Sequence, residues 1–239
     1  MKSVLSKRTE ITSLTLATYN IHRCFGTDGK FKPARIIEVI KQLDADVIAL
    51  QEVETSRDAG LDLLEQISRQ TGLQAIAGMT MLSETAQYGN ALLTRLDIEE
   101  IQREDISIQG REPRGAICIK AKLANKAIRV IATHLGLLPS ERRTQVKQLL
   151  KILEQNTTDI SVLMGDLNEW YLWGRPLRWL HQHFDKNIAI PTFPSRFPVL
   201  ALDRIWVEPK SCLHTVTPYN TRITKKASDH LPLKAELII

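Results

Sequence analysis

The chain contains 239 residues, of which 43% are hydrophobic, and it carries a formal net charge of +5. This length and hydrophobic content are sufficient to bury one large core, so we expect a single domain. No apolar run reaches the roughly 18 residues needed to cross a bilayer, and the opening residues MKSVLSKRTE lack the apolar segment of a signal peptide, which argues against a membrane-spanning or exported protein.

The net charge and the cysteine content limit the partners and the cellular compartment that we expect for this protein. The positive excess favours anionic partners such as nucleic acid, phospholipid headgroups or phosphorylated small molecules, although a similar excess is common in enzymes that bind none of them. The three cysteines, Cys24, Cys118 and Cys212, are too scattered for a disulfide framework or a structural zinc site. We expect a soluble, cytoplasmic and monomeric protein that makes no integral membrane contact.

The first half of the chain alternates between strand and helix patterns after a polar N-terminal arm over residues 1–13. Strands are recognised by alternating or continuous apolar residues, and helices by apolar residues that recur every three to four positions. Proline favours the first turn of a helix, and glycine favours its end. The elements predicted in order are a strand over 14–19, a helix from Pro33, a strand over 47–50, a helix over 61–71 that stops at Gly72, and a strand over 91–94.

The same alternation returns in the second half and then loosens. The elements predicted there are strands over 115–123 and 128–133, a helix over 139–154, a strand over 160–164, a short helix over 176–181, a proline-rich turn region over 191–198, and strands over 204–207 and 231–237. Many strands with two clear helices in each half indicate an α/β protein in which sheets pack together and helices cover them. We expect one such domain over residues 14–239.

Polar side chains lie at the ends of these predicted strands. Those directly after a strand are Asn20, Glu52, His134, Asp166 and Asn168, and those directly before one are Arg114, Asp203, Asp229 and His230. Binding crevices of open α/β sheets lie outside the carboxyl ends of strands, and an antiparallel neighbour begins at the edge where the others end. Both sets are therefore expected to meet on one rim.

Each of these residues also has an ordinary structural interpretation. An isolated Asn20 or Asn168 is more often a turn residue, and a lone His134 or His230 between apolar neighbours is more often a hydrogen-bonded core residue. Glu52 differs because it interrupts an apolar run, where a charge is costly without a partner or a metal. Two histidines together with several acidic residues favour a shared functional site.

The residue types suit metal-assisted phosphoester hydrolysis. Carboxylate and amide oxygens are ligands for Mg²⁺ or Mn²⁺, whereas zinc sites usually contain more His or Cys. Hydrolysis needs a cation, a general base and a group that stabilises the leaving oxygen. Asp203 is the natural carboxylate partner to orient His230 as the base. The sequence has no Gly-rich phosphate loop, GxSxG elbow or dinucleotide fingerprint, which excludes kinases, serine hydrolases and Rossmann dehydrogenases.

Seven motifs in order carry a family resemblance. They are TYNIH (18–22), LQEVE (50–54), YGNALLT (88–94), THLG (133–136), GDLNEW (165–170), LDRIWV (202–207) and SDHLPL (228–233). With these motifs the chain resembles the endonuclease/exonuclease/phosphatase, or deoxyribonuclease I-like, superfamily. That resemblance implies a four-layer α/β sandwich of two packed mixed β-sheets flanked by helices.

The resemblance also implies roles for the rim residues. Glu52 would be the principal metal ligand, with Asn20 binding metal or phosphate and Asp229 near a second metal position. Asp166 would position the attacking water or the metal, Asn168 would contact the phosphate, and His230 would act as general base oriented by Asp203.

Three further positions are weaker members of the expected site. His134 stands where deoxyribonuclease I and the lipid phosphodiesterases carry histidine, and where abasic-site endonucleases carry tyrosine, which disfavours dedicated abasic-site repair. Arg114 stands where relatives often place a basic residue that contacts phosphate. Asn90 would either support His134 by a hydrogen bond or serve in a turn.

The substrate is left open by these motifs. A phosphodiesterase or nuclease acting on DNA or RNA is the leading expectation, and a phospholipid or inositol-phosphate hydrolase and an inactive nucleic-acid-binding module are the alternatives. An aromatic and basic stretch contains Trp170, Tyr171, Trp173 and Trp179, and another spans 193–197. Exposed, these aromatic residues would stack on bases or enter a lipid headgroup region; buried, they would close a lid over the core.

Overall fold

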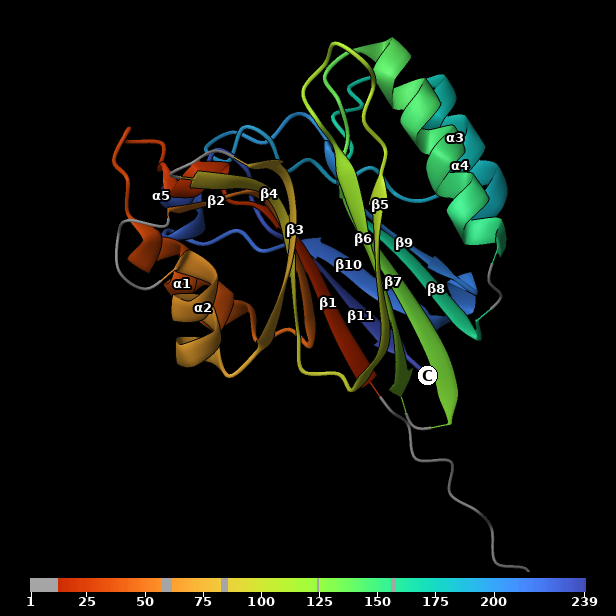
Figure 1. Ribbon diagram of the computed structural model, residues 1–239, viewed down its shortest axis with the longest axis horizontal. Coiled ribbons are helices and arrows are strands. Elements are labelled where there is room, and N and C mark those ends of the chain that lie inside the picture. The colour runs from red at the N-terminus through yellow and green to blue at the C-terminus, as the bar shows by residue number, and fades with distance from the viewer. Residues whose placement is uncertain (1–12, 57–61, 83–85, 124, 156–157) are drawn as a thin grey trace, which may run out of the picture.

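The computed structural model describes residues 13–56, 62–82, 86–123, 125–155 and 158–239. Within these residues, two mixed sheets pack face to face, and helices cover both outer faces (Figure 1). The predicted four-layer α/β sandwich is confirmed. The polar arm lies outside the described residues except for Ser13, which is already the first residue of a strand and pairs with Ile238.

The first sheet has the strand order β10-β11-β1-β2-β4-β3. Its strands are β1 (Ser13–Asn20), β2 (Val47–Ser56), β3 (Gln74–Leu82), β4 (Ala86–Thr94), β10 (Leu213–Pro218) and β11 (Leu233–Ile238). Only β1 and β2 run parallel among these described strands, and β11 pairs antiparallel with β1.

The second sheet has the order β5-β6-β7-β8-β9. Its strands are β5 (Ile98–Asp105), β6 (Gly115–Leu123), β7 (Lys126–His134), β8 (Ile160–Asp166) and β9 (Asp203–Glu208). Here β7 and β8 run parallel, whereas β6 and β9 are antiparallel to their neighbours. In both sheets, strands that end and strands that begin therefore share one edge.

The helices lie in two pairs on opposite sides of the sheets, with α1 and α2 at the left of Figure 1 and α3 and α4 at the right. Their bounds are α1 (Pro33–Leu43), α2 (Leu63–Thr71), α3 (Pro139–Gln155), α4 (Arg175–Phe184) and the single turn α5 (Thr224–Ala227). Each of the long helices buries one apolar stripe, as with Val146, Leu149 and Leu153 of α3. Gly72 ends α2 in the left-handed conformation, as predicted.

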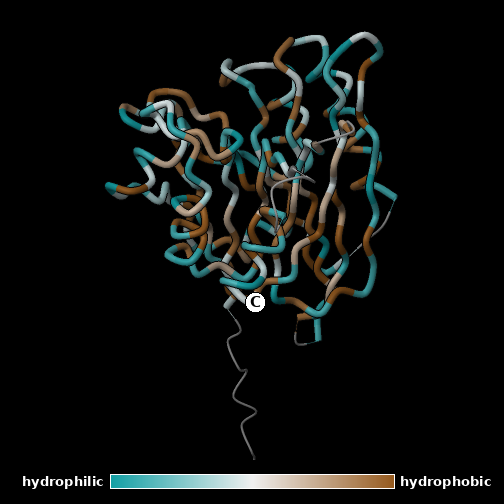
Figure 2. The backbone as a smooth tube through the Cα atoms, turned by 60° about the vertical axis from the view of Figure 1, so that its left-hand side comes forward, coloured by the Kyte–Doolittle hydropathy of each residue, from teal (hydrophilic) through white to brown (hydrophobic). Residues whose placement is uncertain are grey.

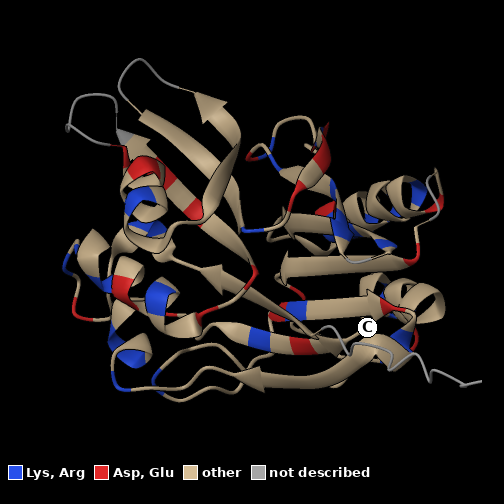
Figure 3. Cartoon of the chain, turned by 90° about the horizontal axis from the view of Figure 1, so that it is seen from below, with Lys and Arg blue, Asp and Glu red and all other residues tan. Residues whose placement is uncertain are grey.

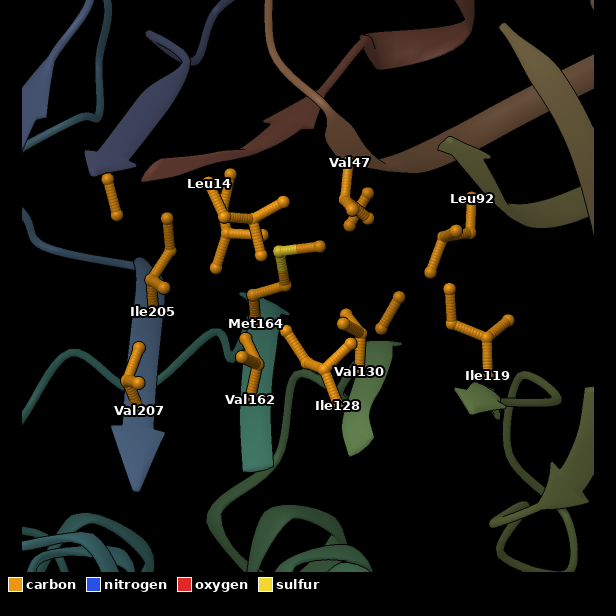
Figure 4. Close-up of a cluster of buried hydrophobic side chains, with 14 of the residues drawn as sticks. Leu14, Val47, Leu92, Ile119, Ile128, Val130, Val162, Met164, Ile205 and Val207 are labelled. Atoms are coloured by element: carbon orange, nitrogen blue, oxygen red, sulfur yellow. The ribbon is translucent and has the colours of Figure 1, made fainter. Parts of the chain in front are cut away.

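The main core lies between the two sheets. Leu14, Val47 and Leu92 of the first sheet meet Val130 and Met164 of the second (Figure 4). Burying one such side chain completely contributes about 1.5–3 kcal/mol relative to leaving it exposed. Figure 2 shows hydrophobic colour along these strands, but also in several outer loops.

Three strands were not predicted: β3, β5 and β10. All three lie at the edges of their sheets. β5 has the sequence IEEIQRED and has no fully buried side chain. Edge strands face solvent and often carry charged residues, so they lack the apolar pattern on which the prediction depended.

Candidate active site

A cavity of about 520 Å³ opens at the edge where the ends of both sheets meet. Seven of the nine predicted site residues line it: Asn20, Glu52, Arg114, His134, Asp166, Asn168 and His230. Asp203 lies behind His230, and Asp229 lies beside His22, with its Oδ1 3.7 Å from Nδ1 of His22. The structure thus brings all nine residues to one rim.

Asn20 joins the two sheets at this rim. It ends β1, and its Nδ2 lies 3.1 Å from Oε1 of Glu52 in its own sheet and 3.1 Å from Oδ2 of Asp166 in the other. The backbone N–H of His22 donates to Asn20 Oδ1 at 3.0 Å, and Ser228 Oγ donates to the Asn20 carbonyl at 2.7 Å. The side-chain amide of Asn20 makes three of these contacts, and its backbone carbonyl makes the fourth. Because Asn20 is fixed in this way, it sets the separation of the Glu52 and Asp166 carboxylates.

Glu52 is aimed at the rim by a bulge in β2. The pairing of β2 with β4 shifts register between Leu50 and Val53, and Glu52 has a φ of +55°. An extra residue at a bulge turns a side chain away from the ordinary alternation of a strand. Burial is the main cause that raises the pKa of Glu52, and the nearby charges of Asp229 and Asp166 raise it further.

His230 is held between two carboxylates. Its Nδ1 lies 2.8 Å from Oδ2 of Asp203, and its Nε2 lies 3.7 Å from Oδ2 of Asp166. Thr192 Oγ1 also donates to Asp203 Oδ2, at 2.5 Å, and the ring of Phe193 lies 4.8 Å from the imidazole. A carboxylate accepts from Nδ1–H, so Nε2 faces the cavity as the proton-accepting atom.

These carboxylates decide the charge of His230. Burial alone would lower its pKa, but Asp203, Asp166 and Asp229 together raise it to about 10. With no added cation at the rim, the imidazole is therefore protonated at neutral pH.

His134 lies beside two hydrogen-bond donors, whereas His230 lies between two carboxylates. Arg114 Nη1 lies 3.1 Å from its Nδ1, and Asn168 Nδ2 lies 3.1 Å from its Nε2. Because a guanidinium only donates, Nδ1 of His134 accepts from Arg114, and the single ring proton is on Nε2. The amide nitrogen of Asn168 is also a donor and gives a hydrogen to the carbonyl of Leu135 at 2.9 Å, so it touches Nε2 without accepting from it. Burial lowers the pKa of His134 to about 3, and Arg114 and His230 act in the same direction against Asp166. His134 is thus a neutral hydrogen-bond donor at neutral pH.

The close approach of β7 and β8 beneath this group depends on Gly165. Gly165 has a φ of +150°, and a Cβ built there would lie 1.9 Å from the carbonyl oxygen of Thr133. Only glycine fits, and the strands can then place His134 opposite Asp166 in register. Asn168, with a φ of +50°, turns back so that its backbone N–H bonds Asp166 Oδ1 at 2.9 Å.

The oxygen donors of the rim fit a hard divalent cation. The charges of Asp229 and Asp166 disfavour the anionic form of Glu52, and the arginines that line the cavity are already paired, Arg23 with Glu54 and Arg114 with Glu112. Added positive charge would therefore be stabilised beside Glu52 and Asp166. Asp166, Asp203 and His230 also form a group whose ligand atoms lie within 4.8 Å of one another. Within this group, Asp203 Oδ2 is already engaged by His230 and Thr192.

The structure adds residues that sequence reasoning missed. His22, Tyr88 and Glu112 line the cavity, and Thr192 bonds Asp203. His22 has a sequence signal, because it stands two residues after Asn20 in the same motif, whereas nothing in the sequence links Thr192 to Asp203. The expectation for Asn90 was wrong: it lies within β4, in no turn, and its Nδ2 donates to the carbonyl of Gly115 at 3.1 Å.

Two packed mixed sheets, with an acidic and histidine-bearing cavity at their shared edge, define the class of sandwich-fold phosphoesterases. Residues 17–230 match the model of the Endonuclease/Exonuclease/phosphatase family, and the chain belongs to this family. Members of the family are hydrolases that act on phosphoester bonds. In the part of the chain that the structure describes, no helix is long and apolar enough to cross a membrane.

Individual relatives share the whole domain. The chain is 31% identical over 250 residues to the uncharacterised protein YbhP of Escherichia coli strain K12, covering 96% of this chain and 98% of YbhP. A family member from Beutenbergia cavernae matches with a TM-score of 0.77 at 21% identity, over 95% of this chain and 72% of that one. A mannosyl-6-phosphatase from Bacteroides thetaiotaomicron matches with a TM-score of 0.72 at 17% identity, over 95% and 100%. The two structural likenesses concern the fold.

Proposed function

We propose that the protein is a divalent-metal-dependent phosphodiester hydrolase in which His230, oriented by Asp203, activates water. The observation that carries this proposal is the arrangement of His230 with Nδ1 on Asp203 at 2.8 Å and Nε2 toward the cavity beside Asp166. A base needs a fixed tautomer and a free nitrogen directed at the attacking water, and this geometry supplies both.

In the proposed step, Nε2 of His230 takes a proton from water as the water oxygen forms a new bond to phosphorus. The bond from phosphorus to the leaving oxygen breaks, and that oxygen departs as an alkoxide that takes a proton from solvent to become an alcohol. Asp166 orients the water, and the Asp203 carboxylate stabilises the imidazolium that forms on His230.

Mg²⁺ or Mn²⁺ would be held by Glu52, Asn20 and Asp229 at the oxygen-rich side of the rim. Bound there, the ion would neutralise phosphoryl oxygens and would lower the pKa of His230 toward neutrality by offsetting the nearby carboxylates. Glu52 supports this placement because it is a half-buried carboxylate that forms no ion pair with a lysine or an arginine among the described residues.

The opposite wall would bind the phosphate. His134 offers Nε2–H in a fixed tautomer, Asn168 brings its amide beside that nitrogen, and Arg114 supplies a buried positive charge. Neutral donors and a guanidinium stabilise the negative oxygens of the transition state without exchanging protons with the base.

Nuclease activity on DNA or RNA is the specific activity that we propose to test first. Hydrolysis of phospholipids or inositol phosphates is the second candidate, favoured by the exposed apolar loops beside the cavity. An inactive nucleic-acid-binding module is disfavoured because the full set of acidic residues and both histidines meet at the rim. We propose a cytoplasmic enzyme that works as a monomer, since one chain contributes every site residue and its three cysteines are buried and unpaired.

The test is hydrolysis of bis(p-nitrophenyl) phosphate with Mg²⁺ or Mn²⁺. We expect turnover with the metal, loss of turnover in EDTA and recovery when metal is added back. Plasmid DNA, single strands, RNA, sphingomyelin, inositol phosphates and a phosphomonoester would then define the substrate. Full activity in EDTA would contradict metal dependence, and Glu52→Gln should raise the metal concentration required for half-maximal rate by about 10-fold or more.

A further inference from the structure

Six apolar side chains form an exposed surface beside the cavity, which we call the apolar loop surface. Its members are Leu137, Leu138, Trp170, Tyr171, Leu172 and Trp173. Trp173 is 74% exposed and Leu137 is 59% exposed. An isolated exposed apolar residue needs no explanation, but contiguous exposed apolar groups mark a binding surface. Trp179 is not a member, because it is half-buried on α4 with Lys147 over its ring.

A buried ion pair holds the two loops of this surface together. Arg142 is 2% exposed, and its Nε donates to Glu169 Oε2 at 3.1 Å, while its Nη1 donates to the carbonyl of Leu137 at 2.5 Å. Glu169 in turn accepts from the backbone N–H of Tyr171 at 3.1 Å. Separating this buried pair would leave an uncompensated charge, so Arg142 and Glu169 hold the loops in a defined position that leaves their apolar side chains outside.

The apolar loop surface adjoins the site. Leu137 lines the cavity, and Trp170 follows Asn168 by two residues. Whatever the surface binds is therefore held at the mouth of the cavity where the phosphate would enter.

Positive charge borders this surface. Arg175 and Arg178, on the first turns of α4, are exposed and have no acidic partner among the described residues. By contrast, the arginines in the cavity wall, Arg23 and Arg114, are each paired with a glutamate. The two arginines without an acidic partner, Arg175 and Arg178, therefore lie next to the exposed tryptophans in the chain.

We propose that the apolar loop surface docks on an anionic phospholipid bilayer and presents the cavity to phosphodiester headgroups there. Tryptophan and tyrosine favour the boundary between headgroups and acyl chains, leucine favours the acyl region, and Arg175 and Arg178 complement anionic headgroups. The proposal rests on the proposed phosphodiester hydrolysis and, of its two candidate activities, favours the second, hydrolysis of phospholipids, over nuclease activity.

The same features fit single-stranded nucleic acid less well. Half of the surface is leucine, which cannot stack on a base as an aromatic ring does. A nucleic-acid groove also needs a track of uncompensated Lys and Arg, whereas Figure 3 shows basic and acidic segments interspersed along the ribbon.

The experiment measures binding of the full chain to vesicles of phosphatidylcholine with about 30 mol% phosphatidylglycerol, whose negative surface potential attracts basic residues. We expect cosedimentation, with a blue shift of tryptophan fluorescence and quenching by brominated lipid. The double variant Leu172→Ala/Trp173→Ala should weaken binding by about 10-fold or more. The variant Arg175→Glu/Arg178→Glu should abolish the preference over pure phosphatidylcholine vesicles.

The matched control is Ile188→Ala, which removes a residue that is 76% exposed and lies outside the apolar loop surface. It should bind vesicles like the unaltered protein. Hydrolysis of bis(p-nitrophenyl) phosphate should be unchanged in all three variants, which shows that each is folded. The docking proposal would be overturned if the unaltered protein failed to bind vesicles. It would also be overturned if the Leu172→Ala/Trp173→Ala variant lost binding to single-stranded DNA but kept its binding to vesicles. Absence of diester hydrolysis in the unaltered protein would refute the proposed function separately.

Discussion

Each of the two sides of the cavity carries one buried histidine, and the pKa values of these two histidines are shifted in opposite directions. His230 and His134 both have Nε2 near the same oxygen, Asp166 Oδ2, at 3.7 Å and 3.6 Å. Yet the pKa of His230 is raised to about 10, and that of His134 is lowered to about 3. Burial lowers the pKa of both histidines. At His230 the Asp203 carboxylate on Nδ1, with Asp166 and Asp229, outweighs burial, whereas at His134 the Arg114 guanidinium on Nδ1 acts in the same direction as burial.

This contrast assigns different chemistry to two residues that look alike in sequence. A histidine with a carboxylate at Nδ1 can take up a proton, whereas one with a guanidinium there stays neutral and donates a hydrogen bond. The Asp203–His230 side is therefore the proton-accepting side of the cavity, and the Arg114–His134 side is its phosphate-binding side.

The largest expected effect separates the two histidines by rate. His230→Ala should lower kcat by about 1000-fold or more because the base is lost, and His134→Ala by about 10- to 100-fold because one hydrogen bond to the transition state is lost. His214→Ala, at an exposed position on β10, should leave the rate unchanged and serves as the control. Steady-state kinetics with bis(p-nitrophenyl) phosphate measures all three, and a reversed order of the first two would break the assignment.

Asp203→Asn should be the next largest, with a rate loss of about 100-fold or more, since the amide neither fixes the tautomer of His230 nor stabilises its imidazolium. The pKa of His230 should also fall, because burial then outweighs the carboxylates that remain. NMR titration of the imidazole in metal-free protein checks the direction. A pKa that stays near 10 in Asp203→Asn would show that Asp203 is not the main cause.

Thr192→Val tests how the Asp203 carboxylate is oriented on the same, proton-accepting side of the cavity. Thr192 donates to Asp203 Oδ2, so its loss leaves the carboxylate oriented by His230 alone. We expect a rate reduction of about 3- to 10-fold and little change in KM, because the substrate does not contact Thr192. Thr144→Val, on the exposed surface of α3, is the matched control. A rise in KM with unchanged kcat would instead place Thr192 in substrate binding.

The smallest effect concerns stability in acid on the His134 side. Because the folded-state pKa of His134 lies below the ordinary value of about 6.5, the unfolded chain binds a proton that the folded chain excludes. Its contribution to the free energy of unfolding is full above pH 6.5 and falls as the pH drops toward 3. One such proton is worth about 1.4 kcal/mol per pH unit.

His134→Gln should flatten this acid-side slope. Urea unfolding between pH 4 and pH 7 measures it, with His214→Ala again as control. An unchanged slope in His134→Gln would mean that His134 is not the proton-linked group.

The interior strands and the long helices follow closely from local pattern. β1 and β6 are predicted from alternating apolar residues, and β7 and β8 from short apolar runs. The structure buries most of the side chains on both faces of these strands. The edge strand β5 has no such pattern, and only its pairing with β6 makes it a strand.

The residues of the site also divide into those that the sequence predicts and those that only the structure reveals. Asn20, Glu52, His134 and Asp166 are visible in the sequence because each interrupts or ends an apolar strand. His230 is visible because it directly precedes one, and Asp203 is expected to partner His230 by its chemistry. Thr192, by contrast, stands 11 residues from Asp203 in a loop, and only the tertiary structure brings them together.

The sequence by itself determines the family, the two-sheet sandwich and the rim on which nine polar residues meet, since these depend on the order of strands and on which residues follow them. The tertiary structure decides what each residue does there. Opposite partners at Nδ1 set the charge of two similar histidines, a bulge in β2 aims Glu52, and the buried pair of Arg142 and Glu169 keeps an apolar surface exposed beside the cavity. Charge states and exposed surfaces arise from contacts between residues far apart in the chain, so local sequence patterns do not contain them.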